Sequence, residues 1–231
     1  MDELEGHRKP SQPRSKPERL VYWYFRINGF LLLENFMLHP DMGPRTVSDV
    51  DLVAVRFVHR RELFPPSEME DDEWLFDAKA WVTAHLVEVK TGMGRINPSW
   101  RRTDAVERAL RAVGLVPPGD VPAVAEELRN AGHVRRGEVC LRITVIGSFP
   151  EPELRYTFIS FNDIIRFLHE RFTRYKLQKS NLSSWPEEGR FLREALEGQS
   201  SSGGLEAYAE RIKTKLFSLC PTPLPSEPPR G

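Results

Sequence analysis

Two short apolar segments of this sequence carry charged residues at a spacing that suits metal and phosphate chemistry. The segment SDVDLVAV contains Asp49 and Asp51, and the segment HLVEVKTG contains Glu88 and Lys90. Both are rich in β-branched residues and bounded by turn-forming residues, which is typical of strands buried on both faces. Side chains alternate along a strand, so each pair shares one face. Because a buried ion costs several kcal/mol unless it is paired or bound to a metal, these charges indicate a functional site.

The chemistry depends on whether the two segments are neighbours. If they are, Asp51 and Glu88 can hold a divalent cation while Lys90 points at whatever that cation binds. Mg²⁺ prefers oxygen ligands and often uses only one or two carboxylates together with substrate phosphate. A bound metal lowers the pKa of a coordinated water, and Lys90 would orient or deprotonate that water or stabilise the transition state.

The same residues also have an ordinary interpretation. Glu88 and Lys90 fit the solvated face of an edge strand, with Val87 and Val89 turned inward. Asp49 fits the turn that opens its strand. The sequence around these segments must decide between the two interpretations.

The surrounding pattern predicts an α/β fold, with a mixed β-sheet flanked by helices. Glycines at 29 and 114 are suited to end helices, and the Pro117-Pro118 pair prevents the second helix from continuing. Thr103 is predicted to cap the second helix and Asp120 the third. The expected elements, in the order α-β-β-β-α-β, are a helix over 17–28, strands at 30–36, 48–55 and 85–92, helices at 103–113 and 120–131, and a strand at 139–146.

This order, with those residues in those places, resembles the PD-(D/E)xK nuclease superfamily, the restriction-endonuclease-like fold. The likeness is strongest to its small Holliday-junction-resolvase-like and endonuclease-like members, and it covers residues 17 to about 160. Three short motifs carry it: Glu18 in a helix before Gly29-Phe30, DVDLV at 49–53, and VEVK at 87–90.

The resemblance implies a divalent-metal-dependent nuclease that hydrolyses phosphodiester bonds in DNA, with a role in repair, recombination or defence. Its catalytic residues would be Asp51, Glu88, Lys90 and Glu18, with Asp49 in support. Asp51 and Glu88 would bind Mg²⁺ (or Mn²⁺), with the main-chain carbonyl of Val89 as a further ligand by resemblance. The alternative is a non-catalytic nucleic-acid-binding or scaffold module on the same fold, because fold does not settle function.

Glu18 has two interpretations of equal weight. It shares a helix face with Val21, Tyr22 and Phe25 and could reach over the sheet to a metal-bound water. It also completes a capping box with Ser15, in which its side chain returns to the backbone of Ser15.

The domain organisation departs from that of the compact family members. An insertion at 59–84 separates the two acidic strands and could cap the site, while a large C-terminal addition could select the substrate. The expected divisions are an N-terminal tail over 1–16, a nuclease-like core over 17–160, a helical extension over 161–217 and a Pro-rich tail over 218–231.

The charges balance overall but are unevenly distributed. The 33 basic and 33 acidic side chains give a net charge of zero, which argues against promiscuous nucleic-acid binding. Two segments are basic, one after Lys90 and one near residues 166–179, and together they could line a groove for a phosphate backbone. The candidate contacts are Arg101, Arg102, Arg174 and Lys176, whereas Arg166 fits a solvated helix face. Trp100 is expected to pack in a core or loop, and it is the aromatic residue to test for base stacking.

Length and composition fit one substantial domain. The chain has 231 residues, of which 40% are hydrophobic and 29% charged. Its longest apolar stretch is too short to cross a bilayer, so neither a membrane segment nor a signal peptide is expected. Cys140 and Cys220 show no metal or disulfide spacing, and the six scattered histidines do not suggest zinc. A cytoplasmic location is therefore expected, and a homodimer is left open.

Overall fold

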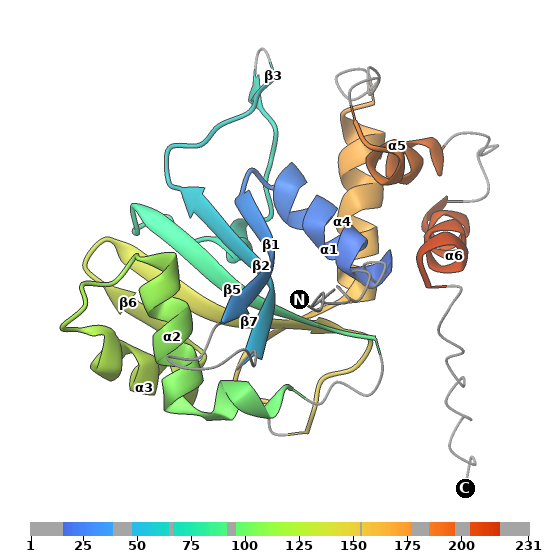
Figure 1. Ribbon diagram of the computed structural model, residues 1–231. Helices are drawn as coiled ribbons and strands as arrows, with labels where there is room; N and C mark the ends of the chain where they lie inside the picture. Colours follow the sequence, from blue (N-terminus) through green and yellow to red (C-terminus); the bar gives the residue numbers. More distant parts are fainter. Residues whose placement is uncertain are drawn as a thin grey trace, which may run out of the picture.

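A mixed β-sheet forms the centre of the computed structural model (Figure 1), which describes residues 16–38, 48–64, 67–91, 96–152, 154–176, 185–196 and 204–217. Within these residues the sheet has six strands in the order β1-β2-β5-β7-β6, and β8 also pairs with β7. The first three strands are antiparallel, whereas β5 and β7 are parallel. The strands are β1 (Leu31–Leu38), β2 (Ser48–Phe57), β5 (Val82–Lys90), β6 (His133–Arg136), β7 (Val139–Gly147) and β8 (Thr157–Ser160).

Helices cover both faces of this sheet and create two hydrophobic cores. On one face α2 (Thr103–Val113) and α3 (Val121–Ala131) pack together through residues such as Leu110 and Leu128. The other face is covered by α1, α4, α5 and α6 (Figure 1). No helix in the described segments is long and apolar enough to cross a membrane. The second layer consists of α1 (Lys16–Ile27), α4 (Phe161–Arg174), α5 (Glu187–Glu194) and α6 (Gly204–Phe217).

Strand β5 is central and buried on both faces. Leu86 belongs to the core under α2 and α3, and its neighbour Val87 belongs to the core under α1 and α4. Because β5 lies between β2 and β7, the interpretation of Glu88 and Lys90 as part of an edge strand is wrong. The prediction of a strand buried on both faces is confirmed.

The predicted elements are present in the predicted order, with boundaries shifted by a few residues and with an additional strand, β6, between α3 and β7. Gly114 ends α2 in a left-handed conformation with φ of 73°, as its position predicted. Thr103 does not cap α2: the helix begins at Thr103 itself, and Arg102 occupies the cap position. Asp120 occupies the cap position of α3 without a capping hydrogen bond from its side chain.

The insertion contributes little regular structure and is held by a buried charge cluster. It contains the short strands β3 (Leu63–Phe64) and β4 (Ser67–Glu68) and the 3₁₀ helix η1 (Glu73–Leu75). Asp71 binds Arg56 at 2.9 Å and Arg171 at 2.6 Å, and all three side chains are almost inaccessible to solvent. Because Arg171 belongs to α4, this carboxylate fastens the insertion to the helical layer.

Candidate active site

Strands β2 and β5 stop pairing next to Asp51, one of the predicted metal-binding residues. Their pairing runs from Phe57 and Val82 to Leu52 and Val87. At the next residue of β2, the Asp51 carboxylate Oδ2 accepts a hydrogen bond from the backbone N–H of Val89 at 2.6 Å. The side chain of Asp51 therefore takes the place of a main-chain acceptor and is held directly beside the backbone of β5.

Glu88 lies next to this contact and is held on both of its carboxylate oxygens. It is 3% exposed. Its Oε2 accepts from the indole Nε1 of Trp100 at 2.8 Å, and its Oε1 accepts from the backbone N–H of Asn97 at 3.3 Å. Lys90 pairs with the same Oε1, as expected for residues that share one strand face. These donors supply what a buried carboxylate requires, since an unpaired charge would be costly in this environment.

The donor set suits a hard cation. A carboxylate has about four lone-pair sites, and Glu88 uses three for Asn97, Trp100 and Lys90, which leaves one acceptor position on Oε2. Asp51 and the main chain at Val89 supply further oxygens of the kind that Mg²⁺ prefers. Among the described residues no group of three or more His, Cys, Asp or Glu side chains could hold a metal ion. A cation here would therefore depend on two carboxylates, waters and substrate oxygens, and the convergence of both carboxylates on one cation stays a prediction.

Glu18 lies in the first turn of α1, near the same end of the sheet. Its neighbour Arg19 pairs at 2.7 Å with Glu34 of β1, and Glu34 faces Leu52 in the strand register. The first turn of α1 is therefore close to the part of β2 that carries Asp51. Ser15, on which the capping interpretation depends, lies outside the described residues, so both interpretations of Glu18 stay open. The side chain of Asp49 is also outside the described part, although its backbone pairs with Met37.

The candidate nucleic-acid contacts do not form one common groove. Arg101 follows Trp100 in the 3₁₀ helix η2 (Pro98–Arg101), on the α2 side of the sheet, and it pairs with Glu151 at 2.9 Å. Arg174 lies in α4, on the other side, and pairs with Glu70 of the insertion. The prediction that both basic segments line one groove is therefore wrong. Arg102 is exposed and pairs with Asp104, and Lys176 is exposed.

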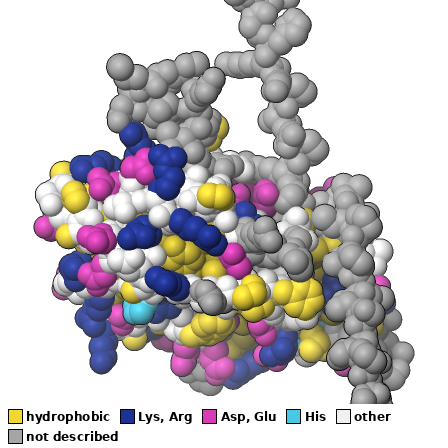
Figure 2. Space-filling view, turned by 90° about the horizontal axis from the view of Figure 1, so that it is seen from below, with side chains coloured by type: hydrophobic (Ala, Val, Ile, Leu, Met, Phe, Trp, Pro, Cys, Tyr) yellow, Lys and Arg dark blue, Asp and Glu magenta, His cyan; other side chains and the backbone are white. Residues whose placement is uncertain are grey.

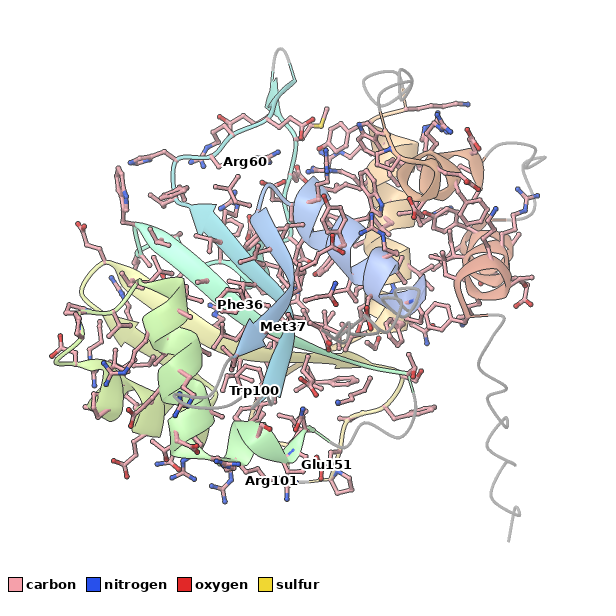
Figure 3. All side chains as sticks on the ribbon, viewed as in Figure 1. Phe36, Met37, Arg60, Trp100, Arg101 and Glu151 are labelled. Atoms are coloured by element: carbon pink, nitrogen blue, oxygen red, sulfur yellow. The ribbon has the colours of Figure 1, made fainter. Side chains whose placement is uncertain are left out.

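The insertion is not a cap over the site, contrary to expectation. It connects the end of β2 to the start of β5, whereas Asp51 and Glu88 lie at the start of β2 and the end of β5. The nine residues of β5 span about 25 Å between these two ends. Figure 3 shows this separation, with Arg60 of the insertion at one end of the sheet and Trp100 at the other.

The contacts of Trp100 and Asn97 with Glu88 were not expected from the sequence. Trp100 is 2% exposed and donates to Glu88, so it cannot serve as a stacking surface for a base. The expectation that it packs in a core is confirmed. No local pattern relates Trp100 to Glu88, because their contact is made by a loop that returns to the strand.

Comparison with models of known protein families, with curated protein sequences and with solved structures found no match.

Proposed function

We propose that this protein is a divalent-metal-dependent nuclease that hydrolyses phosphodiester bonds in DNA. The observation that supports this most is the Asp51 carboxylate, held at 2.6 Å from the Val89 amide between Glu88 and Lys90. Asp51, Glu88 and Lys90 thus all belong to the part of the sheet where β2 and β5 stop pairing. Carboxylate oxygens beside an ammonium group supply the ligands that a hard cation prefers and a donor for a phosphate oxygen, which supports the nuclease proposal.

Each residue has a distinct proposed role. Asp51 and Glu88 would bind Mg²⁺ or Mn²⁺, which when bound stabilises charge on phosphate oxygens and makes a water nucleophilic near neutral pH. Trp100 and Asn97 fix the orientation of Glu88 through their N–H groups. Lys90, whose ammonium group pairs with Glu88, can donate a hydrogen bond to a phosphate oxygen or orient the attacking water.

A second candidate is a non-catalytic nucleic-acid-binding or scaffold module on the same fold. One observation favours it: Lys90 and two N–H donors already satisfy Glu88 within the protein. Under this interpretation the Glu88–Lys90 pair is structural, and addition of a metal changes nothing.

Incubation of the purified protein with linear, branched and single-stranded DNA would separate the two candidates. The nuclease proposal predicts cleavage with Mg²⁺ or Mn²⁺ and its loss with EDTA. Binding without cleavage under every metal condition would favour the non-catalytic module.

A further inference from the structure

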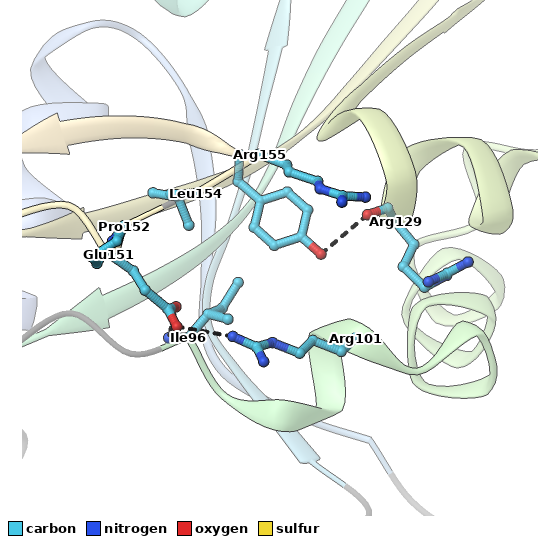
Figure 4. A pocket seen from close by; sticks show the side chains of 8 residues that line it. Ile96, Arg101, Arg129, Glu151, Pro152, Leu154 and Arg155 are labelled. Atoms are coloured by element: carbon cyan, nitrogen blue, oxygen red, sulfur yellow. Dashed lines mark hydrogen bonds and ion pairs between the residues drawn. The ribbon is translucent and has the colours of Figure 1, made fainter.

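A second feature lies directly behind the loop that holds Glu88. It is a cavity of about 490 Å³ on the α2 and α3 side of the sheet (Figure 4). The cavity is formed by residues from η2, from the last turns of α3 and from the segment before β8. Its lining residues are Ile96, Arg101, Arg129, Glu151, Pro152, Leu154, Arg155 and Tyr156.

Positive charge dominates this cavity. Three arginines line it against one carboxylate, and that carboxylate, Glu151, already pairs with Arg101 at 2.9 Å. Arg129 and Arg155 pair with no carboxylate within the described part of the chain. Figure 4 shows the Arg101–Glu151 pair on one side of the tyrosine ring and the Arg129 and Arg155 side chains on the other.

Arg129, which lines this cavity, has one buried donor without a partner among the described residues. Its Nε is inaccessible to solvent and forms no hydrogen bond within the described part of the chain. An atom that solvent cannot reach cannot contact a ligand in the cavity either, so the arginine lining, and not this Nε, points to an anionic ligand. The Tyr156 hydroxyl lies 3.2 Å from the carbonyl oxygens of both Trp100 and Arg129, and its single proton is donated to one of them or shared between the two.

The cavity and the candidate active site share one loop. On one side of this loop, the Asn97 amide and the Trp100 indole donate to Glu88. On the other side, Ile96 donates its backbone N–H to Glu151 at 3.2 Å, and Arg101 pairs with the same carboxylate. The two sites are therefore separated by a single layer of chain. Figure 2, which views this end of the molecule, shows Lys and Arg side chains around a hydrophobic area.

We infer that this cavity binds a phosphate group of the nucleic-acid strand, next to the phosphate that is cleaved. Arginine recognises phosphate with two parallel N–H donors, and an arginine without a carboxylate partner can do so without breaking an ion pair. The ligand is assigned as an internal phosphodiester of the strand, and this inference rests on the proposed function.

Nucleic-acid binding without cleavage tests the inference. We would measure the anisotropy of a fluorescent single-stranded and a duplex DNA at increasing salt, in EDTA, with the full chain. Arg155→Gln, at an exposed position, and Arg129→Gln should each weaken binding and lower the salt dependence by about one phosphate contact. Arg61→Gln is the matched control, because Arg61 is an exposed arginine in the insertion at the other end of the sheet.

The outcomes are distinct for the two proposals. Equal affinity and salt dependence in the parent, Arg129→Gln and Arg155→Gln would overturn the phosphate cavity, as would a parent that binds no DNA at low salt. Loss of binding in Arg155→Gln with no cleavage in any metal would support the cavity and contradict the nuclease.

A second comparison identifies which kind of phosphate the cavity binds. A DNA with a 5′-phosphate that binds no tighter than one without it supports an internal phosphodiester. Tighter binding of the 5′-phosphate form, or equally strong competition by inorganic phosphate alone, would contradict that assignment.

Discussion

The carboxylate of Glu88 depends on donors that come from outside its own strand. Within the described residues, the Trp100 indole supplies the one hydrogen bond to Oε2, at 2.8 Å. Hydrogen bonds to a charged group are stronger than those between neutral groups. Where the group is buried, water cannot take the place of a lost donor. The position of this carboxylate, and hence of any cation beside it, therefore depends on Trp100.

Trp100→Phe tests this dependence by removing the donor while keeping most of the ring. We expect a loss of about 1–3 kcal/mol in the free energy of unfolding, because the buried Oε2 loses its partner. Cleavage should also require more Mg²⁺. Chemical denaturation and a Mg²⁺ titration measure the two effects, with Trp74→Phe as control because Trp74 is half exposed. A Trp100→Phe variant equal to the parent in both would contradict the proposed role.

His85 gives the fold a predictable pH dependence. Its Nε2 lies 2.6 Å from the Leu75 carbonyl, which can only accept, so Nε2 carries the proton and Nδ1 accepts from the Thr144 hydroxyl. Burial lowers the pKa of His85 to about 3, and the hydrogen bond to Leu75 opposes this only in part. In the unfolded chain the pKa is about 6.5, so the unfolded state binds the proton first as the pH falls.

Stability should therefore decrease as the pH falls from about 6.5 toward 3. The slope is at most about 1.4 kcal/mol per pH unit, or about 2 kcal/mol between pH 6.5 and 5. Denaturation curves across this range measure it. His85→Gln should remove this slope, whereas His133→Gln, at an exposed position, should keep it. The same slope in the parent and His85→Gln would show that other groups cause it.

At the scale of elements, the insertion is fastened by one carboxylate among arginines. Asp71 binds Arg56, Arg60 and Arg171, and the first and last of these are almost completely buried. The cluster joins β2, the insertion and α4. This arrangement indicates a structural role at the end of the sheet that is far from Asp51.

Asp71→Asn should therefore destabilise the protein by about 3–5 kcal/mol, because two buried arginines lose their counter-charge. Thermal or chemical denaturation measures this change. Glu68→Gln is the control: its pair with Arg61 is half exposed on both sides, so the change should be about 1 kcal/mol or less. An Asp71→Asn variant as stable as the parent would mean that the cluster contributes little.

Elements with a strong local pattern could be predicted, and those that depend on tertiary contacts could not. The apolar stripe of α2 and the Gly114 signal at its end predicted that helix within one residue. Strand β6 was missed because it has four residues, of which only Val134 is buried, so it carries no alternating pattern. Strand β8 is equally short, and α5 is an eight-residue helix with mostly polar residues.

The same distinction holds for the candidate site. The alternation of polar and apolar residues predicted that Glu88 and Lys90 share a face, and their ion pair confirms it. The contact of Asp51 with the Val89 amide could not be predicted, because it depends on where two strands stop pairing. The prediction of a common groove was wrong for a similar reason, because it also depended on tertiary structure. Arg101 and Arg174 belong to helical layers on opposite faces of the sheet.

At the scale of the whole molecule, the two ends of the sheet have different roles. One end carries the buried Asp71 cluster and the insertion, while the other carries Asp51, Glu88, Lys90 and the arginine-lined cavity. Figure 3 labels Arg60 at the first end and Trp100, Arg101 and Glu151 at the second. A net charge of zero is compatible with this division, because acidic residues of the insertion and basic residues of the cavity lie far apart. The proposed nucleic-acid chemistry therefore lies at one end of the sheet.

Cleavage as a function of Mg²⁺ concentration, compared between Asp51→Asn and Asp120→Asn, tests the central claim most directly. Both variants exchange one carboxylate for an amide, but Asp120 is exposed at the start of α3 and its side chain forms no capping bond. We predict Mg²⁺-dependent cleavage in the parent and in Asp120→Asn, and a loss of at least about 100-fold in Asp51→Asn, in the range of other removed catalytic groups. Parent-level cleavage by Asp51→Asn would contradict the account.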